Sequence, residues 1–159
     1  MFIWHRVFGS LEKEPPPAEL CEELLRHGFA VHPHFRGDDT GWFAARLEWE
    51  DGSSSLNVGR FLVRDDNLRG DLNSWCAWVE TLPTTDTHEA LLDTFVCTKQ
   101  LFTFYADAGP EGEAASLACS ILCRWLAQQT QGIYQIDGQG VYDKDGTLLV
   151  ADTACRAHA

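Results

Sequence analysis

Two histidines, His32 and His34, are the residues whose spacing most directly suggests chemistry. They stand two apart in a segment that alternates like a β-strand, so both side chains are expected on the same face. Imidazoles in this arrangement can chelate a metal ion or act as general acid and base. If this segment pairs with residues 42–50, then Arg46, Glu48 and Glu50 share that face. No third ligand is identified, so a solvated polar face with loose ion pairs is the alternative interpretation.

Trp42 is a candidate of a different kind, an exposed aromatic side chain. The alternation in residues 42–50 places Leu47 and Trp49 on the buried face and groups Trp42 with the polar residues. Exposed tryptophans are enriched at binding surfaces, although a rim tryptophan lying over its neighbours has the same pattern. The sequence therefore predicts a binding surface around Trp42. Its predicted members are Trp42, His32, His34, Arg46 and Glu48.

The remaining motif patterns are incomplete. The Asp143-x-Asp145 pattern resembles the start of a calcium-binding loop, but the twelfth position, Thr153 or Ala154, carries no carboxylate. No Gly-x-Ser-x-Gly motif is present, and none of the six cysteines forms a Cys-x-x-Cys pair. A catalytic pair of one cysteine and one histidine, brought together by the fold, remains an open alternative. We therefore predict no cofactor and no metal, and the sequence favours a non-enzymatic role.

The charge of the chain limits its partners. The formal net charge is −12, from 24 acidic and 12 basic residues, and the basic residues are interleaved with acids. Such a surface repels phosphate backbones and anionic lipids, so neither nucleic acid nor membrane is an expected partner. Residues 1–6 do not have the pattern of a secretory signal, so we expect a cytoplasmic protein with reduced cysteines.

Periodicity predicts the elements that would position these residues. Strands are predicted at residues 29–35, 42–50, 56–64, 96–105, 133–137, 141–142 and 147–150, and residues 2–8 form a short apolar, strand-like segment. Helices are predicted at residues 17–27, 65–82 and 113–129, with a shorter helical segment at 89–93. The helix at 113–129 has one polar stripe at i+4 spacing, formed by Ser116, Ser120, Arg124 and Gln128. Its other sides are apolar, which indicates a central helix packed on the sheet, with a dimer contact as an additional possibility.

Together these segments predict a two-layer α+β domain. We expect a largely antiparallel sheet of five to seven strands with about three helices, mainly on one face. Residues 1–152 would form the single domain, with a strand-like arm and Pro-rich connector at 1–16 and a frayed tail at 153–159. The element order resembles small bacterial chaperone-like and immunity-like domains. We therefore predict a protein-interaction module, with partner binding or self-association; metal-binding and small-molecule-binding proteins are the alternatives.

Overall fold

The computed structural model describes residues 2–107 and 112–151. It contains one antiparallel sheet whose strand order differs from the order of the strands in the sequence. Eight strands lie in this described part, in the order β2-β3-β4-β5-β1-β6-β7-β8. Their bounds are β1 Phe2–Gly9, β2 Val31–Asp38, β3 Gly41–Trp49, β4 Ser55–Leu62, β5 Gln100–Asp107, β6 Ile133–Ile136, β7 Gly140–Asp143 and β8 Leu148–Ala151. The N-terminal segment forms a central strand of the sheet, between β5 and β6.

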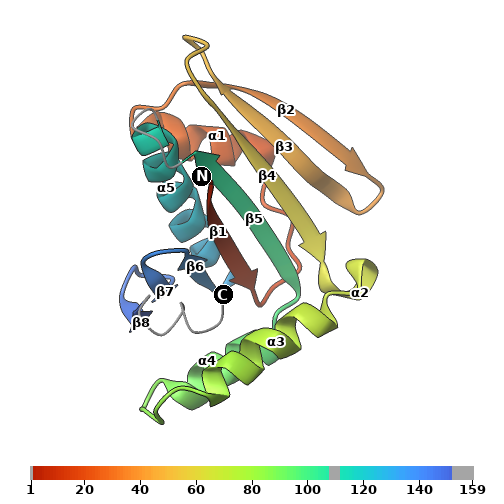
Figure 1. The fold of residues 1–159 in the computed structure, drawn as a ribbon. Coiled ribbons are helices and arrows are strands. Elements are labelled where there is room, and N and C mark those ends of the chain that lie inside the picture. The colour runs from red at the N-terminus through yellow and green to blue at the C-terminus, as the bar shows by residue number, and fades with distance from the viewer. Residues whose placement is uncertain (1, 108–111, 152–159) are drawn as a thin grey trace.

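Five helices accompany the sheet within the described residues. Their bounds are α1 Pro17–Arg26, α2 Val63–Asp66, α3 Arg69–Glu80, α4 His88–Val96 and α5 Glu113–Thr130. Figure 1 shows α1 and α5 together on one face of the sheet, whereas α3 and α4 lie across one end of it. The predicted α+β class and antiparallel sheet are confirmed, but the predicted numbers of strands and helices are too low.

The larger core lies between the sheet and the helices α1 and α5. Alternate strand residues such as Val7, Val58 and Phe104 point into it, as the period of two in a strand requires. From α5, Cys119 and Leu122 are fully enclosed and meet these side chains. The predicted central helix therefore exists, and its apolar sides pack in the core against the sheet. Its polar stripe remains on the outer side, where Arg124 and Gln128 are exposed.

A second core lies on the opposite face of the sheet, under α3 and α4. The neighbouring strand residues that point this way, Phe8 and Leu101, pack against the helices. The ring of Phe8 contacts Trp75 and Phe95 edge to face, at centroid distances of 5.6 and 4.9 Å. The expectation that the helices lie mainly on one face is therefore only partly right. Among the described residues, α3 and α4 cover only one end of this second face of the sheet.

Two local breaks decide where helices end. Asn67 has a left-handed backbone with φ of 53°, which separates α2 from α3 within the segment predicted as one helix. After α5, Gly132 lies so close to β1 that a Cβ atom there would be 1.9 Å from the Phe8 carbonyl oxygen. Only glycine allows this approach, which lets the chain turn directly from α5 into β6.

Two further predictions concern the chain as a whole. The predicted frayed tail at 153–159 lies outside the described residues. None of the helices in the described ranges is long and apolar enough to cross a lipid bilayer.

Candidate functional site

The candidate site lies where strands β3 and β4 separate. The two strands pair from Glu48 and Ser55 as far as Ala44 and Gly59, and their pairing stops there. Beyond that point β4 continues alongside β5, up to the pair of Leu62 with Gln100. Figure 1 shows β3 and β4 diverging toward α2. The divergence leaves a hollow of about 490 Å³ between the two strand ends.

Two exposed aromatic rings line this hollow, one from each strand. Phe43 on β3 is 39% exposed and Phe61 on β4 is 36% exposed. Phe61 lies against Gly59, where a Cβ atom would be 2.9 Å from the phenyl ring. Arg36 places its guanidinium over the ring of Phe43, 5.5 Å from the centroid. Large apolar side chains are usually enclosed, so two exposed rings at one hollow indicate a contact surface.

A buried arginine holds the two strands at the point where their ladder stops. The Arg60 guanidinium donates through Nη1 to the Trp42 carbonyl oxygen at 2.9 Å and through Nε to Oε1 of Gln100 at 2.8 Å. Arg60 is only 4% exposed, and burial lowers the pKa of its guanidinium, an effect that the nearby Glu14 carboxylate opposes. Arg60 thus replaces missing strand pairing with side-chain hydrogen bonds, and it makes up part of the wall of the hollow.

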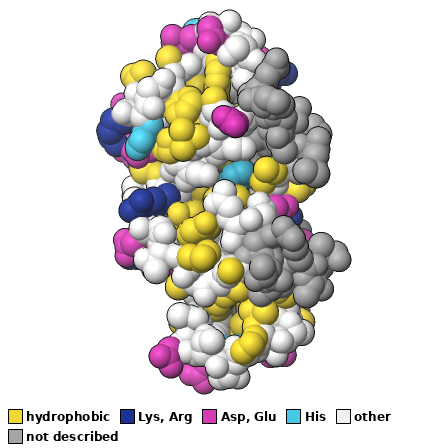
Figure 2. All heavy atoms as spheres, turned by 60° about the vertical axis from the view of Figure 1, so that its left-hand side comes forward, with side chains coloured by type: hydrophobic (Ala, Val, Ile, Leu, Met, Phe, Trp, Pro, Cys, Tyr) yellow, Lys and Arg dark blue, Asp and Glu magenta, His cyan; other side chains and the backbone are white. Residues whose placement is uncertain are grey.

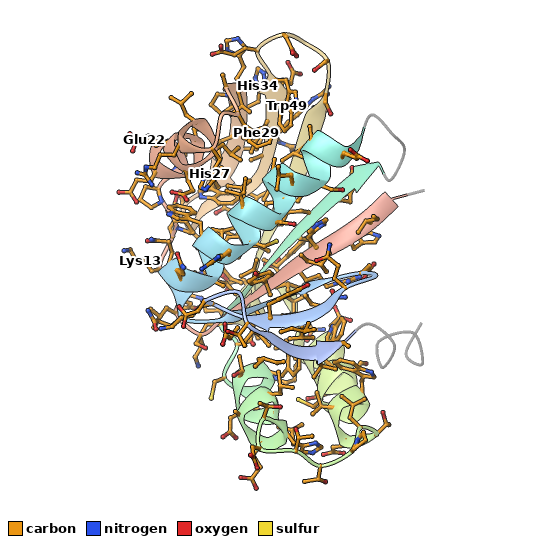
Figure 3. All side chains as sticks on the ribbon, turned by 90° about the vertical axis from the view of Figure 1, so that its left-hand side faces the viewer. Lys13, Glu22, His27, Phe29, His34 and Trp49 are labelled. Carbon is orange, nitrogen blue, oxygen red and sulfur yellow. The ribbon has the colours of Figure 1, made fainter. Side chains whose placement is uncertain are left out.

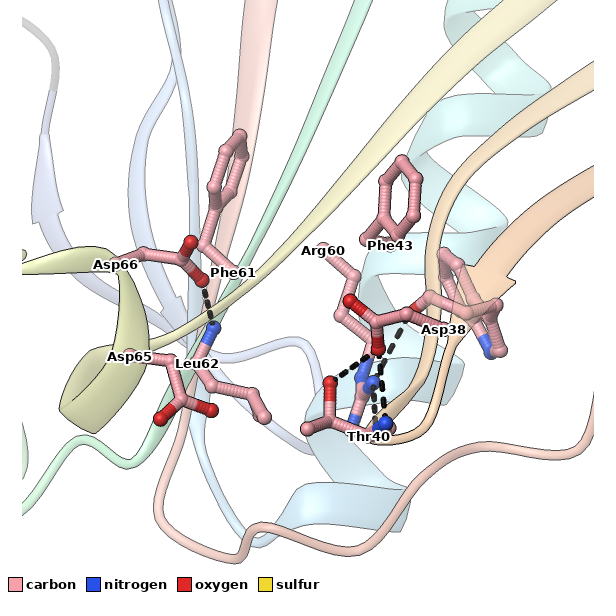
Figure 4. Close-up of a pocket in the computed structure, with 9 residues that line it drawn as sticks. Asp38, Thr40, Phe43, Arg60, Phe61, Leu62, Asp65 and Asp66 are labelled. Carbon is pink, nitrogen blue, oxygen red and sulfur yellow. Dashed lines mark hydrogen bonds between the residues drawn. The ribbon is translucent and has the colours of Figure 1, made fainter.

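Three carboxylates surround the opening. Figure 4 shows Asp38 beside Thr40 on one side of the hollow, with Asp65 and Asp66 on the other. Asp38 accepts hydrogen bonds from the hydroxyl and the amide of Thr40, at 2.6 and 2.8 Å. These bonds lower the pKa of the Asp38 carboxyl and favour its charged form. Asp66 accepts from the backbone N–H of Leu62 at 2.7 Å, which fixes α2 against the end of β4.

The predicted exposure of Trp42 is wrong. Its side chain is only 3% exposed, and its indole N–H donates to the Pro15 carbonyl oxygen at 2.9 Å. The cause is a register shift: Arg36 pairs with Ala44, but the next residue, Gly37, pairs with Trp42. Phe43 is therefore an extra residue, and the inward–outward alternation reverses at this bulge. Trp42 lines the hollow from within, while Phe43, which the alternation assigned to the buried face, is exposed.

The predicted histidine face exists, and it lies apart from the hollow. On the edge strand β2, His32 is opposite Glu48 and His34 is opposite Arg46. Nε2 of His34 is 3.8 Å from Oε2 of Glu48, and Nε of Arg46 is 3.1 Å from Oε1 of the same carboxylate. These are exposed ion-pair contacts. In the ranges that the structure describes, no three His, Cys, Asp or Glu side chains form a group that could hold a metal ion.

The cysteines that the structure describes have free thiols. Cys119 and Cys123 are buried in the larger core, and burial raises the pKa of the Cys119 thiol to about 12. The pKa of the Cys123 thiol is also raised, first by burial and then by Cys119. Since the thiolate is the reactive form, these two side chains serve as small apolar groups.

Apart from Trp42, sequence reasoning missed the residues that line the hollow. The adjacent acids Asp65 and Asp66 could have indicated a binding site, but two acids before a helix are equally typical of helix capping. Phe61 fits a half-buried strand position equally well. Comparisons with known protein families, with curated proteins and with solved structures find no match to this chain.

Proposed function

We propose that this protein is a non-enzymatic protein-interaction module that takes a basic side chain of its partner into the β3–β4 hollow. The observation that carries the proposal is the combination in one hollow of two exposed phenyl rings with three carboxylates. An ammonium or guanidinium group is attracted by the face of an aromatic ring and by carboxylates, and few other groups are attracted by both.

The open sheet face next to the hollow supports a protein partner. Trp4 on β1 is 39% exposed and packs against Tyr105 on β5, with ring centroids 5.0 Å apart. These rings lie on the same uncovered face as Phe61, across paired strands. A partner that places a cation in the hollow can therefore also cover apolar side chains, which is the composition of interface centres. The net charge of −12 favours the approach of a basic partner.

A small-molecule binder is the second candidate, and one observation favours it. A hollow of about 490 Å³ has the size of a metabolite site. The same chemistry would then select a small amine instead of a peptide side chain. Metal binding at His32 and His34 has less support, because their neighbours Arg46 and Glu48 contact each other and no third ligand stands beside them in the described residues.

The test uses defined probes. A Gly/Ser peptide with two arginines, the same peptide with two glutamates, and the diamine putrescine are titrated into the isotopically labelled protein. We expect the arginine peptide to shift the amide resonances of residues 38–43 and 60–66. Phe43→Ala should weaken this binding by about threefold to tenfold, as for an exposed cation–π contact. The double variant Asp38→Asn, Asp65→Asn should weaken it further and reduce its dependence on salt.

Leu117→Ala is the matched control, because Leu117 is exposed on α5 and lies outside the hollow. It should leave the affinity unchanged. Equal binding of the glutamate peptide, or an unchanged affinity of Phe43→Ala, would overturn the proposal. Tight binding of putrescine without any binding of the arginine peptide would move the assignment to the small-molecule candidate.

A further inference from the structure

A second hollow, of about 410 Å³, lies on the helical side of the molecule, between α1 and α5. His27, just after α1, and Arg124 and Gln128 on α5 contribute to its lining. Figure 3 shows His27 on the side of the molecule where α5 lies in front of the sheet. This hollow is separate from the one between β3 and β4, whose lining shares no residue with it.

The floor of this hollow contains a tyrosine with an unused hydrogen-bonding group. Tyr134 on β6 is only 6% exposed, and its ring stacks on Tyr142 with centroids 5.1 Å apart. Within the described residues, its hydroxyl makes no hydrogen bond. The hydroxyl oxygen is not one of the fully buried atoms without a partner, so it opens into the hollow, where a ligand oxygen can accept its hydrogen bond. Burial raises the pKa of the Tyr134 hydroxyl, so at neutral pH it retains the proton that it can donate.

Arg124 supplies a positive charge beside this hydroxyl. Its guanidinium lowers the pKa of Tyr134, opposing the effect of burial, which indicates that the two groups are close. Among the described residues, no carboxylate lies within ion-pair distance of Arg124. The guanidinium rests on the turn at Gly146, where a Cβ atom would be 3.3 Å from Cζ. Arg124 is exposed, and within the described residues its hydrogen-bond donors have no protein partner.

The one carboxylate in the lining is already engaged. Glu23 on α1 forms an ion pair with Arg26, and its other oxygen is 3.8 Å from Nδ1 of His27. Ser120 and Gln128 lie one helical turn before and after Arg124, so their polar groups flank the guanidinium on the same stripe. The Ser120 hydroxyl donates to the Ser116 carbonyl oxygen at 3.1 Å, whereas the Gln128 amide is exposed.

We propose that the hollow between α1 and α5 binds a small organic anion. Its carboxylate or phosphate group pairs with the Arg124 guanidinium and accepts a hydrogen bond from the Tyr134 hydroxyl. A planar guanidinium fork matches both kinds of oxyanion, and Ile121 and Trp125 offer apolar walls for the body of the ligand. The site does not depend on the function proposed for the open sheet face, because the two hollows are separate.

The experiment is a resonance-shift titration of the labelled protein with three aromatic probes of similar size: phenyl phosphate, benzoate and benzamidine. We expect the two anions to shift amide resonances of residues 120–128 and 134, and the cation benzamidine to leave them unchanged. The tighter of the two anions identifies the preferred oxyanion. Arg124→Gln should weaken binding at least about tenfold, and Tyr134→Phe, which keeps the stacked ring, about threefold to tenfold.

Arg64→Gln is the matched control. Arg64 is an exposed arginine on α2, near the β3–β4 hollow, and it pairs with Glu12. It should bind the anions as the unchanged protein does. The inference fails if benzamidine causes the same shifts, or if Arg124→Gln and Tyr134→Phe bind as tightly as the Arg64→Gln control. Loss of binding in Arg124→Gln alone would leave an anion site but remove the role of the Tyr134 hydroxyl.

Discussion

His5 shows how strongly the position of one side chain sets its chemistry. It lies on the central strand β1 and is only 1% exposed. Burial lowers the pKa of its imidazole to about 4, although the Ile3 carbonyl and Asp137 partly oppose this effect. Its Nδ1 atom has no well-formed hydrogen bond within the described residues. In the folded protein at neutral pH, His5 is therefore a neutral residue of the larger core.

This burial predicts a pH dependence of stability. The pKa of His5 is lower in the folded chain than the unfolded value of about 6.5, so protons bind preferentially to the unfolded state. The contribution of His5 is fully present above pH of about 6.5 and is lost as the pH falls toward 4. Linkage then predicts that the free energy of unfolding falls by about 2 kcal/mol between pH of about 7.5 and about 5.

Urea unfolding at these two pH values measures the difference. The variant His5→Leu removes the titrating group and should lose most of the pH dependence. His34→Asn, at an exposed histidine, should keep the dependence of the unchanged protein. If His5→Leu shows the same slope as His34→Asn, the buried imidazole is not the group that responds to acid.

The Pro-rich connector between β1 and α1 shows how a segment without secondary structure is held in place. The Gln100 amide donates to the carbonyl oxygens of Leu11 and Lys13, at 2.6 and 2.8 Å. The Trp42 indole fixes the Pro15 carbonyl, and Gln100 in turn accepts from Arg60. The sequence predicted a Pro-rich connector, and these bonds attach it to β3 and β5. They also stabilise the strand ends that border the β3–β4 hollow.

Removing the amide should release the connector. Gln100→Leu leaves the two connector carbonyls and the Arg60 guanidinium without their partner, which destabilises the attached form by about 1–3 kcal/mol. We expect trypsin to cut after the exposed Lys13 roughly ten times faster, because local opening precedes cleavage. Gln139→Leu, at an exposed glutamine in the turn after β6, should be cut at the original rate. Equal rates for both variants would contradict this role of Gln100.

At the scale of the whole molecule, the sheet separates two surfaces of different chemistry. One surface carries the β3–β4 hollow with its rings and carboxylates, and the other carries the Arg124 hollow between α1 and α5. Figure 2 shows the side turned toward α5, with hydrophobic side chains along its middle and acidic side chains at both ends and scattered between them. Helix α5 offers little exposed apolar surface for self-association, because nine of its residues are already buried within the chain.

We therefore expect a monomer of 17.8 kDa in light scattering at physiological ionic strength. The net charge of −12 opposes association of identical chains, and the exposed apolar surface of α5 centres on Leu117. Leu117→Glu should leave the measured mass unchanged. A dimer that Leu117→Glu converts to a monomer would restore α5 as a self-association surface and contradict this expectation.

The sequence by itself determined the features that depend on short-range order. The α+β class and the three-stranded meander from β2 to β4 follow from alternation and turn residues, and so does the common face of His32, His34, Arg46 and Glu48. The burial of Cys119 and Cys123 follows from the helical period of residues 113–129. These features can be predicted from the sequence because each depends on residues only a few positions apart.

Only the tertiary structure decided the sites themselves. One extra residue, Phe43, reverses the alternation and exchanges the predicted positions of Phe43 and Trp42, and a bulge of this kind is fixed by the partner strand. The β3–β4 hollow exists because the strands separate beyond Gly59, and Tyr134 lines the hollow beside α5 because β6 pairs with the distant β1. Strand order and register arise from contacts between residues far apart in the chain, which local propensities do not encode.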